Sequence, residues 1–76
     1  MTGFALGPPA ADSAEFAAFT ELHGVEPRTP ADAEFLRHLL WFLQLGGDPA
    51  RAASAIAEHR LTRAAAAAIE RARRGP

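Results

Sequence analysis

The chain has 76 residues, a net charge of −1 and no cysteine, and alanine makes up more than half of its apolar residues. This length allows one domain with a thin core, which favours added support from a partner or a second copy of the chain. The composition excludes disulfides and thiolate metal sites, and the longest run of large apolar residues, 39–43, is far too short to span a membrane. With no secretory signal evident, we expect a cytoplasmic protein, and the abundant arginine and alanine are typical of a bacterial genome rich in G and C.

Residues 1–10 are predicted to form an irregular N-terminal tail, because they contain two glycines and two adjacent prolines. Phe4 and Leu6 in this tail are the side chains that would fix it to the core. Residues 11–76 are predicted to form a single helical domain.

The first helix is expected to begin at Asp12, whose carboxylate can cap free backbone amides, with Glu15 completing a capping box. It is expected to end near His23, where Gly24 supplies the left-handed residue that follows many helices. Three large apolar residues spaced three apart are predicted to form its core stripe: Phe16, Phe19 and Leu22.

The second helix is predicted to be capped by Thr29, to carry Pro30 at its first position and to stop at Gly46-Gly47. Its large apolar side chains occupy an arc of about 160°, wide enough for the core face of a globular helix. The arc consists of Phe35, Leu36, Leu39, Leu40, Phe42 and Leu43. We expect this helix to be the central, hydrophobic helix of the bundle.

Trp41 and Leu45 lie outside that arc, one turn apart, and share their side of the helix with Glu34 and His38. Tryptophan is enriched at binding hot spots, and an apolar centre with a polar rim is the usual anatomy of a docking surface. These four residues are therefore the predicted partner-binding site. The alternative is that another helix of the same chain buries Trp41.

A third helix is predicted to open at Asp48-Pro49, with its inward side formed by Ala53, Ile56 and Ala57. One continuous helix to Arg73 would point Ile56 and Ile69 in different directions, so a break over residues 59–62 is favoured. Thr62 then caps a fourth helix. Its apolar stripe consists of Leu61, Ala65, Ala68, Ile69 and Ala72. The predicted fold is all-α, a small bundle of three or four helices.

Little in the sequence points to catalysis or to a cofactor. Ser13 and Ser54 are the only serines, and Gly46-Gly47 lacks the lysine of a phosphate-binding loop. Glu34 and His38 could reach one metal ion together, but His23, Glu58 or His59 would have to complete the site. We expect no enzymatic activity, no metal, no cofactor and no small-molecule substrate.

Charge is distributed unevenly along the chain. Residues 1–50 hold seven acidic and two basic residues, a net −5, whereas residues 51–76 hold six arginines and two glutamates, a net +4. Such asymmetry is typical of a complementary partner surface, or of acidic and basic helices that pack together.

The prediction for function is a small non-catalytic protein–protein interaction module: a docking domain, an accessory subunit or a small homo-oligomer. The alternative is a DNA-binding protein that uses residues 49–74 as a helix–turn–helix. Nucleic-acid phosphates would then be bound by Arg60, Arg63, Arg71, Arg73 and Arg74. Against this alternative, the fourth helix offers mostly alanine where base-reading side chains are needed.

Overall fold

A computed structural model describes residues 7–75 and shows four α-helices with no strand among them. They are α1 (Ala14–His23), α2 (Pro30–Gln44), α3 (Pro49–Glu58) and α4 (Arg63–Arg74). The predicted all-α class and the break between the third and fourth helices are therefore confirmed. Residues 7–10 form no regular element, and the prediction for Phe4 and Leu6 lies outside the described residues.

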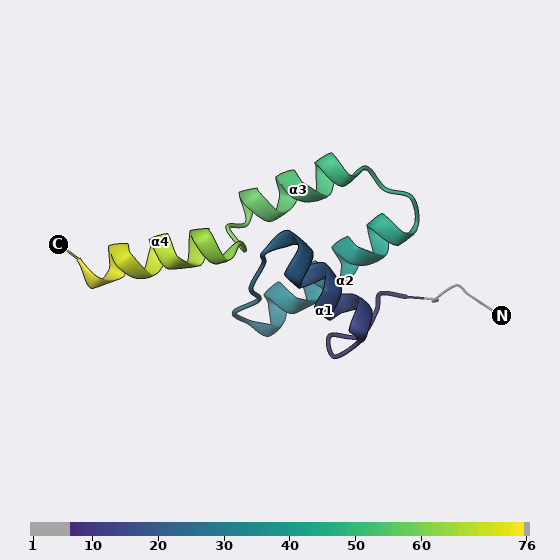
Figure 1. Cartoon of the computed structure of the whole chain (residues 1–76), viewed down its shortest axis with the longest axis horizontal. Coiled ribbons are helices and arrows are strands. Elements are labelled where there is room, and N and C mark those ends of the chain that lie inside the picture. Colours follow the sequence, from purple (N-terminus) through teal and green to yellow (C-terminus); the bar gives the residue numbers. More distant parts are fainter. Residues whose placement is uncertain (1–6, 76) are drawn as a thin grey trace.

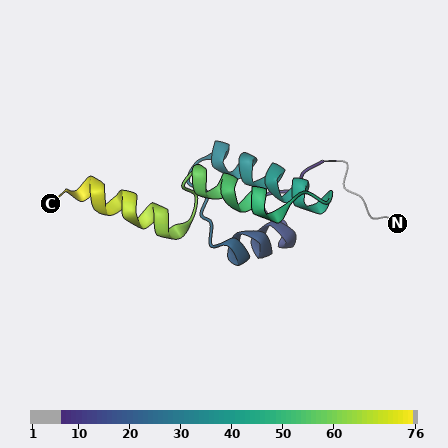
Figure 2. The same cartoon turned by 90° about the horizontal axis from the view of Figure 1, so that it is seen from above.

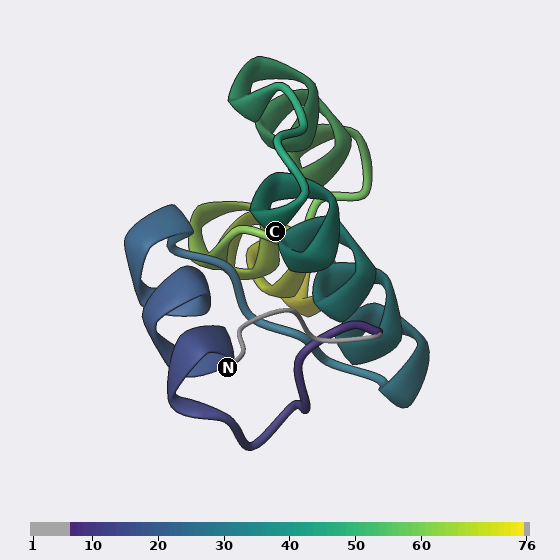
Figure 3. The same cartoon turned by 90° about the vertical axis from the view of Figure 1, so that its right-hand side faces the viewer.

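The first three helices and their connectors, residues 13–62, form what we call the three-helix body. α2 packs against both α1 and α3, which lie on different sides of it (Figure 3). The core residues come from all three helices and from the two connectors that follow α1 and α3. They are Phe16, Phe19, Val25, Leu36, Leu40, Ala52, Ile56 and Leu61.

α4 does not join this body. It runs on from the end of α3 in much the same direction and leaves the body behind, so the C-terminus lies at one tip of an elongated molecule (Figures 1 and 2). The long axis measures 55 Å against 24 and 18 Å for the other two axes. No residue of α4 is buried.

Side-chain caps set the start of each helix. Thr29, Asp48 and Thr62 accept hydrogen bonds from the first-turn amides of α2, α3 and α4, as predicted. The prediction for α1 was wrong by one residue: Ser13, not Asp12, is the cap, and its hydroxyl accepts from the amide of Phe16 at 3.1 Å. Both residue types cap well, so the position of the buried α1 aromatics decides between them.

The break between α3 and α4 is a helix-ending turn of the Schellman type. The amide of Leu61 donates to the carbonyl of Ile56 at 3.2 Å, and that of Arg60 donates to Ala57 at 3.1 Å. Arg60 takes the left-handed conformation, with φ of 56°, that glycine usually provides. The burial of Leu61 against the core holds this turn in place.

The base of α4 is tied to the connector between α1 and α2. Val25 and Thr62 form an isolated antiparallel bridge. The amide of Glu26 donates to the carbonyl of Leu61 at 2.7 Å, and the amide of Arg63 donates to that of Gly24 at 2.8 Å. These backbone bonds fix the direction in which α4 leaves the body.

Two predicted core stripes were partly wrong. Leu22 is 81% exposed, because residues three apart on a helix drift by about 60° each and the second step carries it off the core face. His23, whose ring contacts that of Phe19 at a tilt, with centroids 4.8 Å apart, lies on the core side instead. On α3, Ala53 and Ala57 are exposed.

The buried alanine of α3 is Ala52. It lies one turn before Ile56 and therefore only about 40° from it around the helix. Ala57, the adjacent residue, points about 100° away. The position of the single large side chain thus decides which alanines face the core.

Candidate docking surface

The predicted Trp41–Leu45 face exists on α2, but Leu45 is its only strongly exposed apolar residue, at 64%. Trp41 is only partly exposed, and its indole nitrogen is buried without a hydrogen-bond partner in the described part of the chain. The ring of His38 meets Trp41 edge-on, with centroids 6.3 Å apart. Most of Trp41 is therefore enclosed within its own chain.

Polar side chains on the same side of α2 bind one another and the N-terminal segment. Glu34 forms an ion pair with Arg37, and the ring nitrogen Nδ1 of His38 lies 2.9 Å from the carbonyl oxygen of Glu34. Arg37 also donates through Nε to the carbonyl of Pro9 at 2.7 Å, so residues near Pro9 lie against this side of the helix. The backbone of Pro9 therefore lies against Arg37, beside the face that was predicted to bind a partner.

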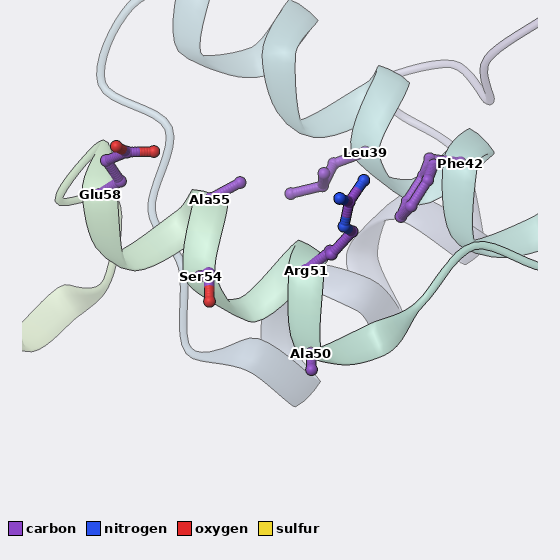
Figure 4. Close-up of a pocket in the computed structure, with 7 residues that line it drawn as sticks. All are labelled: Leu39, Phe42, Ala50, Arg51, Ser54, Ala55 and Glu58. Atoms are coloured by element: carbon purple, nitrogen blue, oxygen red, sulfur yellow. The ribbon is translucent and has the colours of Figure 1, made fainter.

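A second surface, which the sequence did not reveal, lies between α2 and α3. It is an open groove of about 480 Å³ (Figure 4). Leu39 and Phe42 of α2 form one wall. The other wall belongs to α3 and consists of Ala50, Arg51, Ser54, Ala55 and Glu58.

The groove exists because large side chains on α2 face small ones on α3. Leu39 and Phe42 were both predicted to lie in the core, yet Leu39 is only partly buried and Phe42 is 36% exposed. Ala55 and Ser54 are too short to cover them. The signal available in the sequence was the run of small residues along one side of the third helix.

Gly47 helps to hold Phe42 in this position. A Cβ atom at Gly47 would lie 2.4 Å from the Phe42 ring, far inside contact distance. The ring therefore rests directly on the backbone after α2. Any side chain at position 47 would force the ring into the groove or out of it.

Charged side chains lie at both ends of the α3 wall. Arg51 is close to the start of α3 and Glu58 is its last residue, two turns later, and both are exposed. Because they are seven residues apart, they lie on one side of the helix. The groove thus has an apolar floor, a basic end and an acidic end.

α4 carries most of the residues of the predicted nucleic-acid site. Arg63, Arg71, Arg73 and Arg74 are all exposed on it, while Arg60 is exposed in the turn before it. Arg63 also forms an exposed ion pair with Glu21 of α1 at 3.5 Å. In contrast to a helix–turn–helix, whose two helices cross steeply, α3 and α4 run end to end (Figures 1 and 2).

The apolar side of α4 lies largely free of the body. Ala65, Ala66 and Ile69 are half-buried, whereas Ala68 and Ala72 on the same side are exposed. At 100° per residue, Ala67 points about 160° away from Ile69, toward the side that carries Arg71 and Arg74. α4 is therefore an amphipathic helix without a packed partner in the described chain.

The metal-binding alternative finds no support in the geometry of the described residues. Among residues 7–75 there is no group of three or more histidine, aspartate or glutamate side chains placed to hold one ion. Glu34 and His38 lie together as predicted, at 3.5 Å, but His59 lies elsewhere, with its ring tilted against that of Phe35 and the ring centroids 4.3 Å apart.

Comparison of the chain with protein-family models, with curated proteins and with solved structures found no match. Within residues 7–75, no helix is long and apolar enough to cross a membrane.

Proposed function

We propose that this protein is a small, non-catalytic helical module that acts by binding another polypeptide chain, with α4 and the α2–α3 groove as its contact surfaces. α2 would be the central helix that supports both surfaces. A cytoplasmic location fits the absence of cysteine, which suits a reducing compartment.

The main support for this proposal is that α4 extends away from the three-helix body. An isolated helix shorter than about 12–15 residues is marginal in water even when it is rich in alanine. α4 has 12 residues, none of them buried, and its apolar side is mostly uncovered. Docking that side onto another chain would bury apolar area and stabilise a helix that its own body supports only at the base.

The α2–α3 groove supports the same function. An amphipathic helix that lays its apolar side into an apolar groove is a recurring mode of recognition between proteins. Leu39, Phe42 and Ala55 provide the apolar floor, and Arg51 and Glu58 provide charges that fix direction. The Trp41–Leu45 face contributes less, because Trp41 is only partly exposed and Leu45 alone is strongly exposed there.

Two arginine substitutions on opposite sides of α4 test the proposal. Ile69→Arg places a charge on the apolar side, whereas Ala64→Arg adds the same charge about 140° away around the helix, beside Arg71. Both purified variants should keep their helical content by circular dichroism. We expect Ile69→Arg to weaken association with itself or with a purified partner chain at least about tenfold, and Ala64→Arg to leave it unchanged. Equal binding by the two variants would contradict the proposal.

A second candidate function is nucleic-acid binding by the five arginines of residues 60–74. It is favoured by the exposure of Arg60 in the turn before α4 and of the other four arginines on α4, which projects from the body. Affinity for phosphates should fall steeply with salt. Fluorescence anisotropy with a random-sequence duplex at low salt tests it, and no binding at micromolar protein would eliminate it.

A further inference from the structure

We infer that the partner of α4 is a second copy of this chain, in which α4 of each copy lies antiparallel in the α2–α3 groove of the other. This inference rests on the proposed function and names the partner. Three features of the described residues support it: the order of charges on α3 and α4, the end-to-end arrangement of these helices, and the bonds at the base of α4.

The charges on the two helices match in one direction only. On α3 the groove wall runs from Arg51 to Glu58, and on α4 Arg63 is followed by Glu70, again seven residues later. A parallel alignment would place arginine beside arginine and glutamate beside glutamate. An antiparallel alignment places Arg51 beside Glu70 and Glu58 beside Arg63, so both pairs are attractive.

The same alignment brings apolar surfaces together. It sets Ala55 opposite Ala66, and alanine at both positions permits close approach of the helices. Ile69 then lies level with the first half of α3, where Phe42 lines the groove over Gly47. α3 is about 15 Å long and α4 about 18 Å, so one helix covers the other along its full length.

The end-to-end arrangement of α3 and α4 makes this contact reciprocal. When α4 of one copy lies antiparallel along α3 of the second, α4 of the second lies along α3 of the first (Figures 1 and 2). The interface is then the same patch on both copies, related by a two-fold axis near the turn at residues 59–62, and the assembly closes as a dimer.

The backbone bonds at the base of α4 explain why α4 does not occupy the groove of its own chain. Folding back along α3 of the same chain would give the same charge pairs. It would also break the bridge between Val25 and Thr62 and the 2.8 Å bond from the amide of Arg63 to Gly24. With these bonds intact, α4 points away from its own groove, and a second copy is the chain that can reach it.

Charge reversals test the inference. Arg51→Glu and Glu70→Arg each create two repulsive contacts in a dimer of identical variants, so each alone should raise the dimer dissociation constant at least about tenfold in sedimentation velocity. Both residues are exposed, so helical content should not change. Glu15→Arg on α1 makes the same charge change as Glu70→Arg away from the interface and should leave the dissociation constant within about twofold.

Mixing the two variants gives the decisive measurement. A heterodimer of Arg51→Glu with Glu70→Arg contains attractive pairs in both grooves, so the mixture should form dimers that neither variant forms alone. A chain folded back on itself gains nothing from mixing. A wild-type chain that stays monomeric up to about millimolar concentration, or a mixture that remains monomeric, would overturn the inference.

This outcome is separate from that of the proposed function. If the chain is a monomer that binds a different purified protein, and Ile69→Arg abolishes that binding, the second copy is not the partner but the proposed docking function holds. A monomer whose α4 binds duplex DNA instead would overturn both.

Discussion

The three-helix body and α4 differ in what their apolar stripes are made of. The core of the body is formed by side chains such as Leu36, Ile56 and Phe19, and all of the buried apolar residues among residues 7–75 belong to it. α4 repeats the same helical spacing with alanine and one isoleucine, and buries none of them. Burial contributes roughly 25 cal/mol per Å² of apolar area, so an alanine stripe offers little reason to pack. Periodicity makes a helix amphipathic, but side-chain size decides whether it joins the core.

The largest expected effect lies in the body. Leu36 is fully buried at the centre of α2, so Leu36→Ala should lower the free energy of unfolding by about 2–5 kcal/mol. That is comparable with the whole stability of a domain this small. Thermal unfolding followed by circular dichroism measures it. A loss below about 1 kcal/mol would mean that α2 does not hold the body together.

An intermediate effect is expected at the edge of the groove. Gly47→Ala would place a methyl group against the Phe42 ring, and we expect a loss of about 1–3 kcal/mol together with a displaced ring. Phe42→Leu removes the ring and provides the matched control. In that background Gly47→Ala should lower the free energy of unfolding by less than it does in the wild-type chain. Urea unfolding of the four chains gives the coupling between the two sites. Additive losses would show that the ring does not rest on Gly47.

The smallest effect on the body is expected from α4. Ala67→Gly should weaken α4 by about 1 kcal/mol and leave the unfolding of the body unchanged, because Ala67 is exposed on a helix that buries nothing. Hydrogen exchange should already show fast exchange of α4 amides beyond its first turn and slow exchange in α2. Equal protection of α2 and α4 in the monomer would remove the distinction between the two regions.

The sequence predicted what is decided locally. Thr29, Asp48 and Thr62 cap their helices, and Gly24 ends α1 in the left-handed conformation, because each of these features depends on a few neighbouring backbone atoms. The break over residues 59–62 could also be predicted, since one continuous helix would have pointed its two isoleucines apart.

The groove and the projection of α4 could not be predicted in this way. Each depends on which side of a helix meets its neighbour, and that is settled by packing between distant segments. Leu39 and Phe42 fit the core arc by spacing, and only the small residues of α3 leave them uncovered. The partial burial of Trp41 was likewise left open by the spacing of residues along α2, which predicts only that its side chain lies outside the core arc.

The backbone bonds between residues 24–26 and 61–63 attach the base of α4 to the loop that follows α1, so a small rotation of this loop would swing the whole helix. Its far end stands about 18 Å from these bonds, so a rotation of about 10° at the base would move the tip by about 3 Å. The hydrogen bond from Arg28 to the carbonyl of Arg60, at 3.2 Å, also holds this loop against the turn before α4. The direction in which the C-terminal arginines point is therefore controlled by a connector that lies more than 40 residues before them in the chain.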